Sequence, residues 1–290
     1  MEKIANNDIA ILMATYNGEK YLSEQIDSIL AQTCQDWHLY FHDDGSKDNT
    51  VAIIKDYIRR YPKKMTLLDY PSQGGACHNF LSMLERIEAP YYMFCDQDDV
   101  WLTDKIDLSI KTMQNNEKTA PNTPIIVFSD LIVTDSSLNT IAFSFHKYAG
   151  IYPQYIQSFN DLAATVLTPG CSMLINACSK YCIKYPATKA TMHDAWIVAC
   201  VASKCGKIVY IARPLLLYRQ HSQNTLGARD FKQVTLWYRL SHLYNIIKSN
   251  YAHFMMLRDI GYGSIIKYIK YRIIYKKNIA NHNKNNAFSV

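Results

Sequence analysis

The first hundred residues alternate short apolar runs with stretches in which apolar residues recur every three or four positions. The runs at 9–14, 38–42, 65–68 and 91–95 predict buried strands, and polar residues follow them. The stretches between them predict amphipathic helices, as with Leu22, Ile26 and Ile29. Because strands that alternate with helices pair in parallel, this half predicts a parallel sheet with helices on both faces. Ligands bind such sheets beyond the carboxyl ends of the strands.

The rest of the chain has a looser pattern. Runs at 125–129, 172–175, 208–211 and 215–218 predict further strands, and a helix is expected to begin at His193 and Asp194 and to end at Gly206. Two helical stretches follow, around 237–244 and 265–273. We therefore expect an α/β fold with a mixed, mainly parallel sheet over residues 1–228, divided into halves at 1–120 and 121–228. A helical tail is expected over residues 229–290.

Composition narrows the class of protein. Hydrophobic residues make up 49% of the chain and charged residues 19%, which is typical of a globular protein and excludes a disordered one. The eight cysteines form no Cys-x-x-Cys pair, so we interpret them as reduced thiols. The N-terminus is polar, unlike a signal peptide, and no run reaches the roughly 20 apolar residues of a spanning helix. We expect a cytoplasmic protein that does not cross a membrane.

Charge is concentrated near the end of the chain. Residues 231–290 carry ten Lys and Arg and a single acid, Asp259, whereas the preceding residues are close to neutral. Such a basic, aromatic-rich tail is expected to face anionic lipid at the inner surface of the plasma membrane, with no nucleic-acid partner. Alternatively, it forms amphipathic helices that pack on the sheet or on a second copy in a homo-oligomer. The sequence leaves both interpretations open.

The strongest chemical signal is the acidic segment that follows the run at 91–95. Residues two apart in an extended chain point the same way, so Asp96 and Asp98 project together. Two such carboxylates repel each other unless a cation lies between them, and a hard divalent ion that also binds phosphate oxygens meets that need. Alternatively, the segment is an acidic loop that precedes a helix opened by Thr103 or Asp104.

Polar residues also follow the first two predicted strands. The first strand leads into Thr15, Tyr16 and Asn17, and the second into Asp43. A tyrosine ring can stack on a nucleobase, and a carboxylate can accept a hydrogen bond from the imide N–H of a pyrimidine. Each motif alone is also typical of a turn or a helix N-cap. Three polar strand ends at one edge of the sheet together indicate a ligand site.

These segments resemble the nucleotide-sugar-binding half of family 2 glycosyltransferases. The similarity is carried by ATYNGEKYLSEQIDSILAQT, DDGSKDNT, GGACHNF and FCDQDDVWLTDK, and it extends from about Ile9 to Gly227. The Asp-Gln-Asp-Asp-x-Trp form is similar to the bacterial rhamnosyltransferase-like branch. The resemblance implies a GT-A fold, an inverting reaction and a divalent cofactor, Mg²⁺ or Mn²⁺. It departs at Gln73-Gly74-Gly75, where many relatives have Asn-x-Gly, so no ligand contact is assigned to that loop.

The resemblance implies roles for residues on the donor side. Thr15, Tyr16 and Asn17 would border the donor nucleotide, and Asp43 would accept a hydrogen bond from its base. Asp96 would face the ribose and the metal.

The resemblance also implies a metal and diphosphate site. Asp98 would be the principal metal ligand, and Asp99 is expected to organise the turn. His221 would complete the metal site, since neutral imidazole suits a metal, although a surface histidine is the alternative. Arg219 would contact the diphosphate, because a guanidinium group suits phosphate.

The second half resembles the acceptor side of the family. Gly170 and Cys171 resemble its acceptor-side loop, and His193 and Trp196 flank Asp194, which resembles the catalytic base. Inverting transfer needs one carboxylate to take a proton from the attacking hydroxyl, while a metal stabilises the leaving diphosphate. At a helix N-terminus, Asp194 is expected to keep a low pKa. Alternatively, Asp194 is only a favourable first-turn acid.

The leading hypothesis is a metal-dependent inverting glycosyltransferase. It would move a sugar from a UDP- or dTDP-linked donor to a glycan or lipid-linked acceptor in cell-surface polysaccharide synthesis. A non-catalytic nucleotide-sugar-binding module is the alternative from another class. A sugar nucleotidyltransferase is less favoured, because Thr15-Tyr16-Asn17-Gly18 stands where such enzymes carry a Gly-rich, basic phosphate loop.

Overall fold

The computed structural model describes residues 8–222, 224, 227–228 and 241–287, and it confirms the strand–helix alternation of the first half. The elements in order are β1 (Ile9–Thr15), α1 (Leu22–Leu30), β2 (Trp37–Asp43), α2 (Thr50–Arg60), β3 (Met65–Leu67), α3 (Ala76–Arg86) and β4 (Tyr91–Cys95). The helix α2 ends just before Pro62, whose ring cannot continue a helix.

The second half contains shorter and more varied elements. They are β5 (Val100–Trp101), α4 (Lys105–Thr119), β6 (Ile125–Thr134), β7 (Thr140–Ala142), α5 (Phe145–Ala149), the 3₁₀ turns η1 (Pro153–Tyr155), η2 (Phe159–Ala163) and η3 (Gly170–Ser172), β8 (Met173–Asn176), α6 (Ala177–Lys180), α7 (His193–Ser203) and β9 (Lys207–Arg219). The prediction of separate strands at 208–211 and 215–218 is wrong, because β9 runs through both. Pro214 lies at a register irregularity with β6, where an interrupted ladder tolerates a proline.

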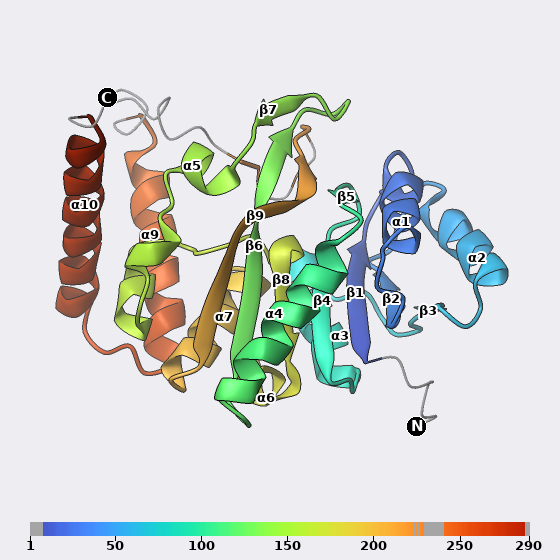
Figure 1. Cartoon of the computed structure of the whole chain (residues 1–290), viewed down its shortest axis with the longest axis horizontal. Helices are drawn as coiled ribbons and strands as arrows, with labels where there is room; N and C mark the ends of the chain where they lie inside the picture. Colours follow the sequence, from blue (N-terminus) through green and yellow to red (C-terminus); the bar gives the residue numbers. More distant parts are fainter. Residues whose placement is uncertain (1–7, 223, 225–226, 229–240, 288–290) are drawn as a thin grey trace.

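The sheet has the strand order β3-β2-β1-β4-β8-β6-β9-β5, with β7 paired to β6 at the side (Figure 1). β1 runs parallel to β2 and β4, β2 to β3, and β6 to β9. β8 is antiparallel to β4 and β6, and β5 to β9. The expected mixed, mainly parallel sheet is therefore confirmed. The carboxyl ends of β1, β2 and β4 meet at one edge.

Two apolar layers cover the sheet, one on each face. Alternate side chains of β1 point to opposite faces, so Ile9 and Ile11 belong to one layer and Ala10 and Leu12 to the other. The first layer is completed by α1, α2 and α4, and the second by α3 and α7. All the side chains of β1 except Ala14 are buried, as expected for a strand covered on both faces.

Two helices near the end of the chain, α9 (Leu243–Asp259) and α10 (Ile265–Ala287), stand at one end of the molecule (Figure 1). Phe254, Met256, Leu257, Tyr268 and Tyr275 are buried in the layer that contains α3 and α7. Within the part of the chain that the structure describes, no helix has the length and hydrophobicity needed to cross a membrane. The predicted helical stretch at 237–240 lies outside the described residues.

Candidate active site

A cavity of about 1060 Å³ opens at the carboxyl ends of β1, β2 and β4. This volume is at the upper end of the range for small-molecule sites. The lining of the cavity comes from the strand ends and residues 72–76 in the predicted donor half, and from residues within 145–151, 165–170 and 192–194 in the predicted acceptor half. Residues from both halves therefore line one space.

The structure brings seven of the thirteen sequence-predicted site residues to the cavity wall. These are Thr15, Tyr16, Asp96, Asp98, Gly170, His193 and Asp194. The other six are not among the residues that line it: Asn17, Asp43, Cys171, Trp196, Arg219 and His221. The three carboxylates on which the hypothesis depends are thus in one cavity.

The end of β1 is held by Gln97, which the sequence analysis did not single out. The side-chain amide of Gln97 accepts a hydrogen bond from Tyr16 N at 2.9 Å and donates one to Tyr16 O at 3.0 Å. The amide also lies so close to Gly18 that a Cβ atom there would be 2.3 Å from its oxygen. The ring of Tyr16 is 56% exposed at the cavity wall, so it is free to stack on a planar ligand.

Asp43 is occupied by hydrogen bonds within its own loop. Its carboxylate accepts bonds from Thr15 Oγ1 at 2.9 Å, from Ser46 Oγ at 2.6 Å and from the backbone N–H of Gly45 and Ser46. Asn17 similarly accepts a bond from Lys47 N at 2.8 Å. These contacts join the ends of β1 and β2, whereas a contact of either residue with a donor stays a prediction.

Asp44, one residue further, lines the cavity and was missed from the sequence. It accepts hydrogen bonds from Ser72 Oγ and from the backbone N–H of Gln73, Gly74 and Gly75, at 2.6 to 3.2 Å. Burial would raise the pKa of this carboxyl, but these bonds outweigh it and lower the pKa below its usual value. Gly74 and Gly75 have φ of 76° and 115°, which other residues rarely adopt. The features of the sequence that could have indicated this contact are the Asp43-Asp44 pair and the Gly74-Gly75 pair.

Asp98 and His221 meet at the cavity. The Nε2 atom of His221 lies 2.7 Å from Asp98 Oδ2, and the two side chains retain exposed fractions of 13% and 15%. The His221 ring also stacks on Tyr21, with centroids 4.9 Å apart. A carboxylate and an imidazole in this arrangement are both suitable ligands for a divalent cation.

Arg219 is buried behind this pair rather than aimed at the cavity. Its guanidinium group donates to Asp98 O at 2.7 Å, to Ser136 O at 2.9 Å and to the carboxylate of Glu24. Its backbone N–H donates to Asp99 Oδ1 at 3.1 Å. Since these bonds use both ends of the guanidinium fork, Arg219 acts on the site by holding the acidic segment. Its predicted diphosphate contact stays untested.

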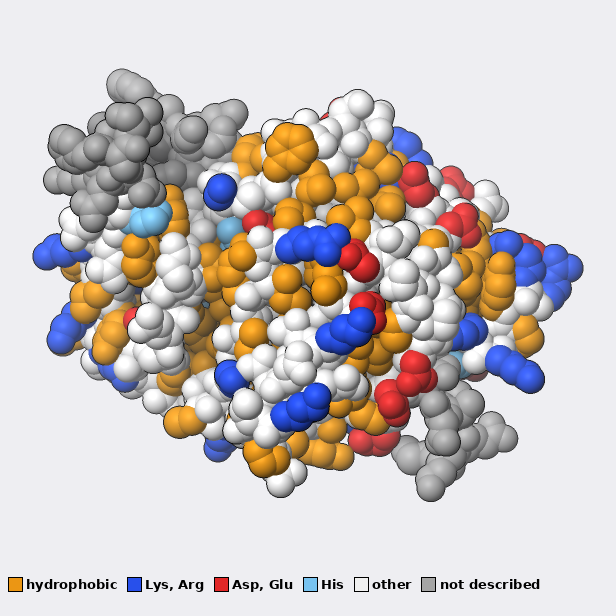
Figure 2. All heavy atoms as spheres, viewed as in Figure 1, with side chains coloured by type: hydrophobic (Ala, Val, Ile, Leu, Met, Phe, Trp, Pro, Cys, Tyr) orange, Lys and Arg blue, Asp and Glu red, His pale blue; other side chains and the backbone are white. Residues whose placement is uncertain are grey.

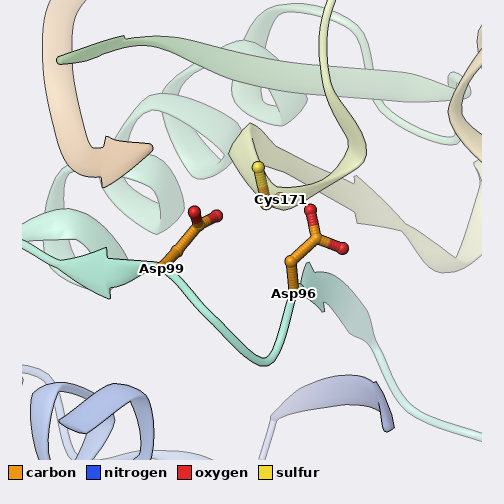
Figure 3. Close-up of side chains that lie close together, drawn as sticks. All are labelled: Asp96, Asp99 and Cys171. Atoms are coloured by element: carbon orange, nitrogen blue, oxygen red, sulfur yellow. The ribbon is translucent and has the colours of Figure 1, made fainter. Parts of the chain in front are cut away.

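A second cluster consists of Asp96, which lines the cavity, and the fully buried Asp99 and Cys171 (Figure 3). One ligand atom of each lies within 4.8 Å of the others. Asp99 is fully buried, and its Oδ2 has no hydrogen-bond partner among the described residues. The buried Lys105 is close enough to influence this cluster, and burial lowers the pKa of Lys105 to about 8 against the opposing effect of Cys171, Cys95 and Asp99.

A hard divalent cation suits the Asp98–His221 pair better than the cluster of Asp96, Asp99 and Cys171. Burial raises the pKa of the Cys171 thiol well above its usual value, so the thiol stays protonated and is a poor ligand. Lys105 adds positive charge near that cluster. Asp98, in contrast, lines the cavity and keeps access to solvent.

Asp194 lies in the first turn of α7 and lines the cavity. It accepts hydrogen bonds from Ala195 N at 2.6 Å and Gly170 N at 3.1 Å. The prediction of a low pKa is wrong, because burial raises the pKa of Asp194 to about 6 despite these bonds. Burial also raises the pKa of Asp96, and the charges of Asp98 and Asp194 add to that effect. The cavity therefore concentrates negative charge that a cation would relieve.

His193 lies between Phe80 and Phe94, with ring centroids 4.2 and 5.4 Å away. Burial lowers its pKa to about 3, so the ring is neutral, and neither nitrogen has a hydrogen-bond partner in the described part of the chain. Gly170 permits this position, because a Cβ atom there would be 2.1 Å from His193 Nε2. Trp196 is fully buried and donates to Lys184 O, so its predicted acceptor contact stays a prediction.

Comparisons with known proteins agree with this geometry. Residues 10–178 match the family model described as Glycosyl transferase family 2. The chain is similar to the dTDP-rhamnosyl transferase RfbG of Shigella flexneri, with 30% identity over 252 residues that cover 78% of this chain and 81% of that protein. It is also similar to the UDP-Glc:alpha-D-GlcNAc-diphosphoundecaprenol beta-1,3-glucosyltransferase WfgD of Escherichia coli, with 31% identity over 108 residues, 37% of this chain and 42% of that one.

A solved structure shares the fold. The mannosyltransferase PcManGT from Pyrobaculum calidifontis, in complex with GDP-Man and Mn²⁺, matches with a TM-score of 0.55 and 15% identity. The match covers 76% of this chain and 58% of that chain. The chain thus spans roughly half the length of WfgD and PcManGT, and the second likeness concerns the fold alone.

Proposed function

Because the chain belongs to glycosyl transferase family 2, we propose that it transfers a sugar from a nucleoside diphosphate sugar to a hydroxyl group with inversion. The fold is that of GT-A glycosyltransferases, and the chain is a glycosyltransferase. The observation that carries the mechanism is that Asp96, Asp98 and Asp194 line the same cavity. A donor held by the residues around Asp96 and Asp98 would be attacked by an acceptor hydroxyl that Asp194 contacts.

The donor nucleotide would lie against the ends of β1 and β2. Tyr16 offers an exposed ring for the base, and Gln97 fixes the backbone that presents it. The loop 72–75 lines the cavity beside these strand ends and is held in shape by Asp44. The donor we propose is a pyrimidine nucleotide sugar, linked as UDP or dTDP, and the name of RfbG supports the second of these.

Asp96, Asp98 and His221 would hold a divalent cation, Mg²⁺ or Mn²⁺. When bound, that cation would neutralise the charge that develops on the leaving diphosphate. The three side chains supply two hard oxygen ligands and one imidazole, and Arg219 fixes the position of Asp98 through its main-chain oxygen. The mutual repulsion of the carboxylates keeps this site receptive to positive charge.

Asp194 would take the proton from the acceptor hydroxyl. A carboxylate with a pKa of about 6 is ionised at neutral pH, yet it is a stronger base than an exposed aspartate. The bonds from Gly170 N and Ala195 N hold its oxygens in place. The neutral ring of His193, on the same wall, can accept or donate a hydrogen bond to a sugar hydroxyl.

The relatives suggest where this reaction belongs. RfbG is named a dTDP-rhamnosyl transferase and WfgD a glucosyltransferase that acts on a diphosphoundecaprenol-linked sugar. We therefore place the chain in cell-surface polysaccharide synthesis, with a glycan or lipid-linked acceptor on the cytoplasmic side of the membrane.

The test is nucleotide release from a panel of UDP-, dTDP- and GDP-sugars in the presence of lipid-linked acceptors, with Mn²⁺ or with EDTA. We expect turnover with one pyrimidine donor, its loss in EDTA and its loss in Asp98→Ala. Asp36→Asn, which changes an exposed carboxylate just before β2 and so at the other edge of the sheet, is the matched control and should behave as wild type. Donor binding without turnover on every acceptor would favour a non-catalytic module, and turnover that survives EDTA would refute the metal role.

A further inference from the structure

The outward face of α10 is apolar although nothing among the described residues covers it. Fifteen large hydrophobic side chains of the described chain are exposed, and nine of them lie in α9 and α10. Five are isoleucines of α10, at Ile265, Ile266, Ile269, Ile273 and Ile274, and the exposed fraction of Ile266 is 77%. Exposed isoleucines so concentrated on one helix indicate a surface that meets something apolar.

Lysine side chains share this face. Lys270, Lys276 and Lys277 are exposed, and at about 100° per residue they fall within the same half of the helix circumference as the five isoleucines. Asp259 is the one acid between residues 241 and 290, and it is paired with Lys184 at 2.8 Å. Figure 2 shows Lys and Arg side chains along the end that carries α9 and α10, with most of the visible acidic side chains elsewhere on this face, where Lys and Arg are also present.

The inward face of α10 is firmly attached, so the outward face is not merely the side of a loose helix. Tyr268 and Tyr275 are buried, and Tyr275 Oη accepts a hydrogen bond from Tyr152 N at 3.0 Å. Arg272 donates to Ala163 O at 2.9 Å. One face of α10 therefore packs on the rest of the protein, and the other is exposed.

We propose that the outward face of α10, made of the five isoleucines together with Lys270, Lys276 and Lys277, binds the surface of an anionic lipid bilayer. Isoleucines would enter the boundary between headgroups and acyl chains, while the flexible lysine stems carry their charges out to lipid phosphates. A second copy of the chain fits this face poorly, because a symmetric contact would oppose lysine to lysine with no acid to pair them.

Bilayer binding through this face would also orient the cavity. The segments that α10 holds, at Tyr152 and Ala163, lie next to Ile151 and Thr165, which line the acceptor wall. The bilayer would thus lie close to the wall from which a lipid-linked acceptor enters. This consequence rests on the proposed function, whereas bilayer binding itself does not.

The experiment is co-sedimentation of the full chain with phosphatidylcholine vesicles that contain or lack phosphatidylglycerol. We expect binding to the anionic vesicles that weakens with added salt. The triple variant Lys270→Gln, Lys276→Gln, Lys277→Gln should bind them roughly 100-fold more weakly, since each lysine near such a surface contributes about fivefold. The triple variant Ile266→Ser, Ile269→Ser, Ile273→Ser should lose at least as much, because each isoleucine stops contributing burial.

Matched controls distinguish binding through this face of α10 from nonspecific electrostatic or hydrophobic binding by other parts of the surface. Two control variants change exposed residues elsewhere and should bind as wild type: the triple variant Lys55→Gln, Lys63→Gln, Lys118→Gln and the double variant Ile141→Ser, Phe143→Ser. The proposal would be overturned if both α10 variants bound the vesicles as well as wild type. It would also be overturned if wild type were a dimer and the isoleucine variant a monomer. Because the readout needs no turnover, failure here leaves sugar transfer untouched, and an inactive enzyme would leave bilayer binding measurable.

Discussion

Replacing Asp194 by asparagine should abolish transfer and yet stabilise the folded protein. Asp194 is buried at the start of α7, and burial raises the pKa of its carboxyl from 3.8 to about 6. The folded protein therefore holds an ionised group in surroundings that disfavour its charge. A residue kept at such a cost is typical of a functional site, where activity and stability compete.

The magnitude follows from the shift. Two pKa units correspond to about 3 kcal/mol by which ionised Asp194 destabilises the fold at pH 8. Asparagine has one acceptor oxygen, so it loses one of the bonds from Gly170 N and Ala195 N, which costs about 1 kcal/mol. The net gain for Asp194→Asn is about 2 kcal/mol, or roughly 4 °C in melting temperature.

The sign of the pH dependence gives a sharper test. Because the folded pKa is raised, the folded protein binds an extra proton between about pH 4 and pH 6, and wild-type stability falls as pH rises through that window. The stability difference should favour Asp194→Asn by the full amount at pH 8 and should reverse near pH 4, where the charge no longer contributes and only the lost hydrogen bond remains. Chemical unfolding at several pH values, with EDTA present so that no cation contributes, measures it.

Activity should change in the opposite direction. Loss of the base should lower kcat by roughly 10²- to 10⁴-fold while the donor still binds near wild-type affinity. The wild-type rate should rise with pH to a plateau, with an apparent pKa of about 6. An asparagine variant that is less stable than wild type at pH 8, or whose stability difference does not depend on pH, would refute the burial argument. An active variant would refute the base.

Three further predictions concern the rest of the site. Asp98→Asn and His221→Gln should each weaken apparent Mn²⁺ affinity by roughly 10- to 100-fold in activity titrations, and equal Mn²⁺ dependence in wild type and both variants would exclude these ligands. Gly170→Ala should lower the activity and also the stability, by about 1–3 kcal/mol, because the added Cβ would meet the His193 ring. Adding His193→Ala should restore the stability but not the activity. Additive effects of the two substitutions on stability would disprove the contact. Arg219→Lys should lower stability by about 2 kcal/mol and weaken Mn²⁺ binding with little change in donor KM; a raised donor KM alone would support the diphosphate contact instead.

The site shows where sequence reasoning reached its limit. Asp96, Asp98 and Asp194 could be predicted to share a cavity, since strand ends converge and the motifs are distinctive. The orientation of the Arg219 side chain, in contrast, could not be predicted from the sequence. A guanidinium group is suited to phosphate by its chemistry, but its orientation depends on which carbonyl oxygens and carboxylates surround it, and those come from residues far away in the chain, such as Ser136 and Glu24.

The pKa of Asp194 illustrates the same division. Its position at a helix N-terminus was visible in the sequence and does supply hydrogen bonds. The extent of burial was not visible, and burial dominates the pKa. Asp44 was passed over for a related reason, because the loop that donates four bonds to it lies about thirty residues further along the chain.

What the sequence determined by itself was the periodic and local part of this protein: the order of strands and helices, the parallel half of the sheet, and the edge at which the acidic motifs emerge. These follow from side-chain spacing and from short motifs, which need no distant partner. Only the tertiary structure decided that β9 is continuous past Pro214, that Asp44 and Gln97 shape the cavity, that Arg219 turns away from it, and that α10 is packed on one face and exposed on the other. Each of these depends on contacts between residues far apart in the chain, and burial and hydrogen bonding there outweigh local preference.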